Sequence, residues 1–355
     1  RSLLRQYAGS VLPAAFWEGV LIPARVKNYR ASMLDAFLAE GEMFWQMDEK
    51  GGLHFAFQED IDWDADMDSC LQNLDEKEQK ACEALLKRGA SFLQALNRLF
   101  LGESAYDTLL SLMEKGLVCA DSFLPVRQWL DREKAKKLSV RQLAGMRAKA
   151  LRAGRWDVAR PLAQTCLTAE KKLERCFNRN LIACRETVAA CWLSWQDALS
   201  VLRIWEYTGQ ARRGYFVEGL SGAQFIRGSD YQAVVRLLQN PQQELCWVNA
   251  ADPAQCWGKI LAHQEGRSFL NVPGNAAACY AGLPVAVMER QGKVLRIFEP
   301  DMAAQILELF VKEYRAGRIF PALNRIVVKE YPQWAAGALA GAGFQREMRD
   351  YVLYI

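Results

Sequence analysis

The chain has 355 residues, of which 51% are hydrophobic and 24% charged, with a net charge of +4, which is typical of a globular protein built from several small domains. Its ten cysteines contain no C-x-x-C pair and its two histidines stand alone, so no metal or other cofactor is expected. With no secretory signal and no apolar run long enough to span a bilayer, we expect no membrane contact and a cytoplasmic location in which the thiols stay reduced.

Residues 1–73 are predicted to form a short α/β segment that ends in an acidic linker. Apolar spacing predicts a helix over residues 31–40, and alternation predicts strands through Trp45 and over residues 54–58. The acidic run over residues 59–68 is interpreted as a solvated loop, because so polar a run offers no pocket for paired catalytic acids.

Residues 74–130 are a first winged-helix candidate. The pattern predicts helices over residues 76–87, 89–100 and 104–115, and then strands and a turn over residues 117–126. Helix, short turn, helix, glycine and hairpin is the order expected of a winged helix. A small helical bundle would show the same periodicity, so this alternative stays open.

Residues 131–160 are predicted to form a basic connector suited to DNA phosphates. The stretch from Pro125 to Asp230 carries about 20 Lys and Arg against 10 acids, so a nucleic acid would prefer it to the acidic N-terminal part. The alternative is a solvated linker whose charge only confers solubility. The candidate phosphate-binding residues of the connector are Lys134, Lys136, Lys137, Arg141, Arg147, Lys149, Arg152 and Arg155.

Residues 161–240 are a second and stronger winged-helix candidate. Helices are predicted over residues 170–178, 181–190 and 194–207, the last of them with Ser194 as its N-cap. Gly209 ends that helix, and a short hairpin is then expected, with an Arg-Arg pair at its turn and residues 215–217 returning as a strand.

The last of these helices would enter a groove of DNA while the hairpin lies along the phosphates. Its apolar face is assigned to Leu199, Leu202, Trp205 and Tyr207, and core packing is also favoured for Tyr215 and Phe216. For the two arginines the alternative is a solvated turn. The predicted DNA contacts of this domain are Gln196, Arg203, Arg212 and Arg213, with Asp197 and Ser200 on the same exposed helix face.

Residues 241–355 change to short apolar runs cut by turns, which predicts a small β-barrel followed by a short α/β tail. The sequence Asp252-Pro253 is interpreted as a turn. The fold class expected for the whole chain is therefore α+β, with tandem winged-helix domains ahead of the barrel. The tail elements predicted are a helix over residues 302–316, a strand over 325–329, a helix over 333–342 and a strand over 351–355.

Catalytic signatures are missing from the pattern. The chain has no G-x-x-x-x-G-K-[ST] loop, no DEAD-type box and no dinucleotide fingerprint, so no ATPase motor is encoded in these residues. With two isolated histidines, a Ser–His–Asp or Cys–His site is also not expected.

Several segments together resemble the C-terminal half of the large helicase-related (Lhr) proteins of bacteria, in the same order and over nearly the whole chain. The most specific are RRGYFVEGLSGAQF at residues 212–225 and AADPA at residues 250–254. The others are LIPARVKNYRASMLDAFLAEGEMFW at residues 21–45, GLVCADSFLPVR at 116–127, GRWDVARPL at 154–162, VPGNAAACYAGLPVAV at 272–287 and LAGAGFQREMRDYVL at 339–353.

The resemblance implies a superfamily 2, ATP-dependent, 3′-to-5′ DNA helicase of bacterial DNA repair, whose motor would lie N-terminal to these residues. It also implies tandem winged helices and a β-barrel similar to the AlkZ-type DNA glycosylases, in a bacterial cytoplasm. Some members of the family excise uracil through an aspartate near the C-terminus, and Asp350 is the acid in that place here. The AlkZ-type glutamine pair is not evident, since Gln291 and Gln345 are isolated.

The leading hypothesis is thus a DNA-binding accessory region of such a helicase, whose partners are DNA (single-stranded or damaged duplex) and the motor of the same polypeptide. A second hypothesis is a DNA glycosylase for uracil or damaged bases, with Asp350 as its catalytic carboxylate. A third is a docking scaffold or homo-oligomer, and a fourth is a tandem winged-helix transcription regulator.

Overall fold

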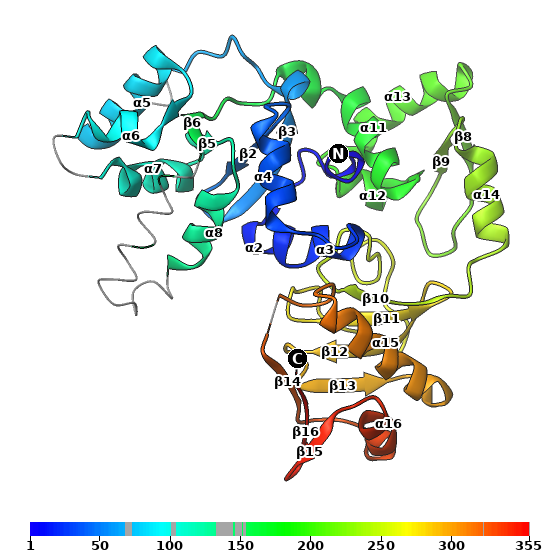
Figure 1. The fold of residues 1–355 in the computed structure, drawn as a ribbon. Coiled ribbons are helices and arrows are strands. Elements are labelled where there is room, and N and C mark those ends of the chain that lie inside the picture. The colour runs from blue at the N-terminus through cyan, green and yellow to red at the C-terminus, as the bar shows by residue number, and fades with distance from the viewer. Residues whose placement is uncertain are drawn as a thin grey trace. The chain divides into compact units, whose positions relative to one another are not determined.

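The computed structural model describes residues 1–67, 73–100, 104–132, 145, 151, 154–321 and 323–354 (Figure 1). The chain forms two compact units. The first unit consists of residues 1–18 and 28–168, and the second of residues 19–27 and 169–355. No helix in the described part of the chain is both long and apolar enough to cross a membrane.

The N-terminal elements form a three-stranded sheet of order β1-β3-β2 with helices around it. They are α1 (Ser2–Gln6), β1 (Leu12–Pro13), α2 (Ala14–Phe16), η1 (Trp17–Leu21), α3 (Ile22–Arg25), α4 (Ala31–Ala39), β2 (Met43–Met47), β3 (Gly52–Phe57) and η2 (Gln58–Asp60). The helix and both strands predicted here are confirmed. Asp48 closes the β2–β3 hairpin, because its carboxylate accepts hydrogen bonds from the backbone N–H groups of Lys50 and Gly52.

The next elements form a sheet of order β4-β6-β5. They are α5 (Glu76–Arg88), β4 (Ser91–Phe92), α6 (Leu93–Asn97), α7 (Ala105–Glu114), β5 (Val118–Ala120), α8 (Leu124–Leu130) and β6 (Arg155–Val158). The first helix begins with a capping box, in which Asp75 and Glu78 each accept a hydrogen bond from the other's backbone N–H. Two details differ from expectation: strand β4 interrupts the predicted helix over 89–100, and the predicted turn over 117–126 runs into helix α8.

The described end of the predicted basic connector is part of a sheet. Strand β6 pairs with both β4 and β5 and is therefore the central strand of the second domain. The stretch over 131–153 thus lies between two strands of one sheet in the sequence, rather than between two domains. The sequence analysis did not predict strand β6, because its four residues, RWDV, contain only two alternating apolar positions.

A third sheet, of order β7-β9-β8, repeats the same plan. Its elements are η4 (Gln164–Leu167), α11 (Ala169–Asn180), β7 (Ile182–Ala183), α12 (Arg185–Ala189), α13 (Trp195–Tyr207), β8 (Ala211–Gly214), β9 (Gln224–Arg227) and α14 (Tyr231–Gln239). The predicted hairpin is wrong in its turn: Arg212 and Arg213 lie within strand β8, residues 215–223 form the loop, and the returning strand is β9.

The three sheets share one strand order, in which a two-residue first strand and the second strand flank the third. In each case a helix precedes the first strand and further helices lie between the first and second strands. This is the winged-helix arrangement of helices and hairpin. The described residues therefore contain three winged-helix domains, one more than the pattern predicted. The additional winged helix is the N-terminal α/β segment.

The C-terminal part contains two sheets on one hydrophobic core, which includes Trp247, Phe310, Ile326 and Leu353. A four-stranded antiparallel sheet has the order β10-β11-β12-β13, and a three-stranded sheet has the order β14-β16-β15. The elements are β10 (Leu245–Asn249), β11 (Ala276–Tyr280), β12 (Leu283–Glu289), β13 (Val294–Ile297), η5 (Pro300–Met302), α15 (Ala303–Arg315), β14 (Arg325–Val328), η6 (Gln333–Ala335), α16 (Ala336–Gly341), β15 (Gln345–Glu347) and β16 (Asp350–Tyr354).

The predicted small barrel is not confirmed. Among the described residues the four-stranded sheet is open, and β10 and β13 are its two edges. Helix α15 covers one face and supplies Phe310 to the core, so the apolar runs that predicted a closed barrel are buried by a helix instead. The tail elements expected after the barrel are confirmed in type and order.

Candidate nucleic-acid interface

Helix α13 of the third winged helix presents a polar face to solvent. Ser194 is its N-cap, as predicted, since its hydroxyl accepts a hydrogen bond from the backbone N–H of Asp197. Ala198, Val201 and Leu202 are buried against the domain core. The opposite side leaves a row of exposed polar residues, which are Gln196, Asp197, Ser200 and Arg203.

Aromatic residues at the end of this helix and in the following loop depart from the predicted core packing. Trp205 does pack, with its ring stacked at 6.2 Å from Phe177. Tyr207, however, is 93% exposed, and Tyr215 is 79% exposed. Neither tyrosine belongs to the core of the domain, which includes Leu173, Phe177 and Phe225.

Arg212 and Arg213 lie side by side in an edge strand and point to opposite faces of the sheet. Arg212 pairs with Ile226, and its guanidinium lies 4.9 Å from the centroid of the Tyr231 ring on α14. Arg213 pairs with Phe225 on the other face. Both side chains are exposed, and no salt bridge among the described residues neutralises either.

The loop that follows β8 is held by one buried amide. Gln224 is 1% exposed, and its Oε1 accepts hydrogen bonds of 2.8 Å from the backbone N–H groups of both Phe216 and Val217. Its Nε2 donates to the Val217 carbonyl, also at 2.8 Å. On the far side of the loop, the Ser221 hydroxyl donates to Glu186 at 2.6 Å. Sequence reasoning missed Gln224, although a lone polar residue before Phe225 and Ile226 was its signal.

Burial would raise the pKa of Glu186, but hydrogen bonds from Ser221 and from other groups around the carboxyl outweigh it. The pKa of Glu186 is consequently lowered, so the carboxylate is charged at neutral pH and accepts from the loop. Hydrogen bonds therefore hold the loop between β8 and β9 at both of its ends.

Only one candidate residue of the predicted connector has a described side chain. Arg155 donates from its Nε to Asp121 at 2.8 Å, and its backbone N–H also donates to Asp121. This pairing leaves Arg155 less available to a phosphate than predicted. The remaining candidates of the connector lie outside the described residues, and they are Lys134, Lys136, Lys137, Arg141, Arg147, Lys149 and Arg152.

Asp350 lies in the central strand of the C-terminal three-stranded sheet, directly opposite Glu347. Alternation along β14 and β16 puts Arg325, Val327 and Asp350 on the outer face, since Ile326, Val328, Tyr351 and Leu353 are buried on the other. The outer face is hollowed into a groove of about 680 Å³. Its lining residues are Lys293, Arg325, Val327, Lys329, Glu347, Met348, Arg349, Asp350 and Val352.

The two isolated glutamines are not brought together as a pair. Gln345 is in β15 of the three-stranded sheet, whereas Gln291 is in the turn between β12 and β13 of the other sheet. The groove therefore combines one candidate catalytic carboxylate with basic side chains, an arrangement that the linear sequence did not reveal.

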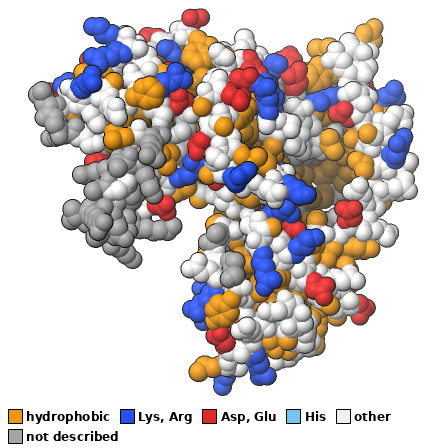
Figure 2. All heavy atoms as spheres, in the orientation of Figure 1, with side chains coloured by type: hydrophobic (Ala, Val, Ile, Leu, Met, Phe, Trp, Pro, Cys, Tyr) orange, Lys and Arg blue, Asp and Glu red, His pale blue; other side chains and the backbone are white. Residues whose placement is uncertain are grey.

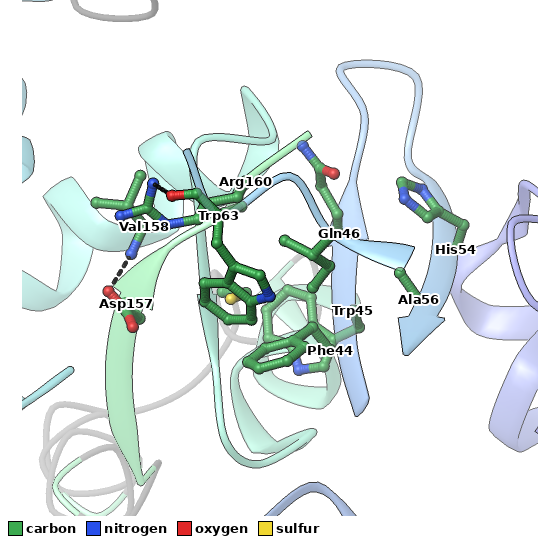
Figure 3. Close-up of a pocket in the computed structure, with 12 residues that line it drawn as sticks. Phe44, Trp45, Gln46, His54, Ala56, Trp63, Asp157, Val158 and Arg160 are labelled. Carbon is green, nitrogen blue, oxygen red and sulfur yellow. Dashed lines mark hydrogen bonds between the residues drawn. The ribbon is translucent and has the colours of Figure 1, made fainter. Parts of the chain in front are cut away.

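A second hollow, in the first unit, is too small to hold a base. Phe44 and Trp63 meet edge to face at 5.5 Å there, and the Arg160 guanidinium lies 5.9 Å from the centroid of the Trp63 ring (Figure 3). The cavity measures about 20 Å³, which accommodates a water molecule at most. Among the residues that the structure describes, no cluster of three or more His, Cys, Asp or Glu could hold a metal ion.

Three winged-helix units in series, with exposed arginines on the third, define a tandem winged-helix protein. Two family models of the large helicase-related protein, each describing a winged-helix domain, match residues 1–57 and residues 164–245. The first match covers the segment that the sequence pattern assigned only to an α/β fold.

Two curated proteins are similar over most of the chain. It is 27% identical over 344 residues to the "Lhr helicase/ probable uracil glycosylase" of Mycolicibacterium smegmatis, an alignment that covers 86% of this chain and 22% of that protein. It is 26% identical over 399 residues to the "Lhr helicase/uracil glycosylase" of Escherichia coli, covering 96% of this chain and 25% of that protein. Two winged-helix domains of the chain thus match the large helicase-related family, and the chain spans about a quarter of the length of these relatives.

Proposed function

We propose that this chain is a DNA-binding accessory region of an Lhr-type ATP-dependent 3′-to-5′ helicase that acts in DNA repair. The observation that carries the proposal is the surface of the third winged helix. There Gln196 and Arg203 on α13 and the two arginines of β8 are exposed, while Gln224 fixes the loop beside them.

In this proposal α13 supplies polar contacts to a groove, and the arginines of β8 contact the phosphates. Arg213 has no ion pair to give up among the described residues, and Arg212 is oriented by the ring of Tyr231. The motor that uses the bound strand lies in the same polypeptide, outside these residues.

The double substitution Arg212→Ala with Arg213→Ala tests the proposal. Loss of two phosphate contacts is expected to make the plot of log binding constant against log salt concentration less steep by about 1.8 for duplex DNA. It should weaken binding similarly for all sequences. The matched control is Lys312→Ala with Arg315→Ala on α15, which removes the same charge from another surface. Fluorescence anisotropy over a salt series measures both variants. Unchanged affinity of the arginine variant at low salt contradicts the proposal.

A second candidate function is excision of uracil from DNA, and the groove around Asp350 favours it. A base that leaves the helix can enter there while Lys293, Arg325, Lys329 and Arg349 attract the phosphates. The names of both relatives include a uracil glycosylase.

The chemistry of this candidate needs one carboxylate. The bond between sugar C1′ and uracil N1 breaks and its electron pair leaves with the base, while the Asp350 carboxylate stabilises the positive charge that develops on the sugar. Water then adds its oxygen to C1′ and gives a proton to the carboxylate. The carboxyl group passes this proton through solvent to the uracil anion, so the products are an abasic site and free uracil and the carboxylate is regenerated. The second carboxylate, Glu347, lies beside Asp350 but accepts a hydrogen bond from Tyr354.

Asp350→Asn is expected to lower the rate of uracil excision about 10²-fold or more, because the amide cannot neutralise the sugar cation. Glu347→Gln is the matched control and is expected to keep most of the activity, since its partner is Tyr354. Release of abasic product is measured by alkaline cleavage of a labelled uracil-containing strand. Full activity of Asp350→Asn would remove this residue from the reaction.

A further inference from the structure

The hairpin that borders the groove ends in an exposed methionine. Glu347 and Asp350 pair directly, so Met348 and Arg349 form the two-residue turn between β15 and β16. The Met348 side chain is 96% exposed, the largest value among the exposed large hydrophobic residues of the described chain. Figure 1 shows this hairpin in red.

The backbone of the turn makes this residue choice unusual. Met348 has a φ of 54°, in the left-handed region where glycine and asparagine are much less strained than a residue with a long side chain. A solvated turn gains nothing from an apolar side chain at this position, since burial would supply no stability there. The position therefore combines backbone strain with full exposure, which indicates a role for the side chain outside the folded domain.

The surroundings of the turn are basic. Lys293 and Lys329 are neighbours, because the Lys293 carbonyl accepts hydrogen bonds from the backbone N–H groups of Lys329 and Glu330. Continuing the β14–β16 register by one residue places Lys329 opposite Asp350, and Arg349 stands next to Met348 in the turn. No salt bridge among the described residues occupies Lys293, Lys329 or Arg349. Figure 2 shows several Lys and Arg side chains on the visible face of this C-terminal part.

An apolar tip between free cations matches the requirements of a residue that opens duplex DNA. Proteins that kink DNA insert such side chains between base steps, while neighbouring cations hold the phosphates of the two strands. Methionine suits this task because its unbranched thioether adapts to an irregular gap between bases.

We propose that the β15–β16 hairpin enters a groove of duplex DNA and inserts Met348 between adjacent base pairs, with Lys293, Lys329 and Arg349 on the flanking phosphates. The inference rests on the proposed binding of DNA, but it does not require the excision chemistry. If that chemistry is present, the same insertion delivers an unstacked nucleotide to the groove, since Asp350 follows Met348 by two residues.

Short duplexes that carry the fluorescent base 2-aminopurine at successive positions test this proposal, because its emission rises when the base is unstacked. The full chain is expected to raise the emission at one or two positions, and Met348→Ala is expected to lose more than about half of that rise. Met348→Leu restores an apolar tip and should recover it. Leu283→Ala removes an exposed apolar side chain beside another hairpin turn, between β11 and β12, and should leave the rise unchanged.

Affinity is measured on the same samples by anisotropy, with single-stranded DNA of the same sequence alongside. Met348→Ala should bind the single strand within about twofold of the unsubstituted chain, because an unpaired strand needs no wedge. Equal emission from Met348→Ala, or duplex binding by the unsubstituted chain without any rise in emission, overturns the insertion and leaves DNA binding intact. Absence of binding to either form of DNA overturns the proposed function itself, and the insertion with it.

Discussion

At the scale of single residues, hydrogen bonds made by buried polar side chains fix the position of the exposed side chains near them. Gln224 satisfies three backbone groups of the loop after β8, and Asp252, interpreted from the sequence as a turn residue, accepts two hydrogen bonds of 2.6 and 2.7 Å from the Arg25 guanidinium. The pair of Arg25 and Asp252 joins segments far apart in the sequence, and the hydrogen bonds of Gln224 span a loop. Spacing rules describe neighbours along one element, so they predicted neither of them.

Gln224→Leu is expected to destabilise the third winged helix by about 1–3 kcal/mol, because it leaves the N–H groups of Phe216 and Val217 without their acceptor. It should also weaken DNA binding, since the loop beside the arginines loses its support. Gln239→Leu, at the exposed end of α14, is the control and should change neither property. Urea denaturation and anisotropy check the two effects. A stable Gln224→Leu variant with unchanged affinity would show that the loop needs no such anchor.

At the scale of elements, the long periodic segments were predicted correctly and the two-residue strands were not. Helices α4, α7, α11, α13 and α15 each bury an apolar stripe that is visible in the sequence. Strands β4 and β7 have two residues each and lie between helices, so their residues were absorbed into predicted helices. Their existence depends on pairing with β6 and β9, which come much later in the chain.

The pairing of α5 with α7 depends on an ionised carboxylate. Burial would raise the pKa of Glu78, but hydrogen bonds from Lys115, Ser111 and the backbone of Asp75 outweigh it and lower that pKa below its ordinary value. The distances from Lys115 Nζ and Ser111 Oγ to the carboxylate are 2.6 and 2.7 Å. Since the folded pKa is the lower one, the stabilisation is present above the unfolded value of about 4.3 and is lost as the pH falls through the folded value.

Acid denaturation of Glu78→Gln tests this linkage. The variant is expected to be less stable than the unsubstituted chain at pH 7, and the difference should shrink as the pH falls below about 4.3. Glu83→Gln, at an exposed position of the same helix, is the control and should show no such convergence. Free energies of unfolding from urea titrations at pH 3 to 7 provide the comparison. A pH-independent difference would mean that packing, and not charge, stabilises this contact.

At the scale of the whole molecule, one winged-helix plan occurs three times ahead of a C-terminal part with two sheets. The α+β class and the order of the tail were predictable from local patterns. The additional, N-terminal winged helix and the open sheet were not, because both depend on which strands pair across long distances. The same limit applies to the groove: Asp350 was singled out by its place near the C-terminus, but its basic neighbours come from three separate strands and turns.

The central claim is that DNA lies on the third winged helix, and hydrogen–deuterium exchange of the full chain with and without a duplex tests it most directly. The account predicts slower exchange in the presence of DNA over α13 and over residues 211–227, with a second protected region at residues 345–350 if the hairpin also engages. Gly209 and the following backbone up to Arg213 should be included in the first region. Binding of DNA with unchanged exchange throughout α13, β8 and β9 would contradict the account.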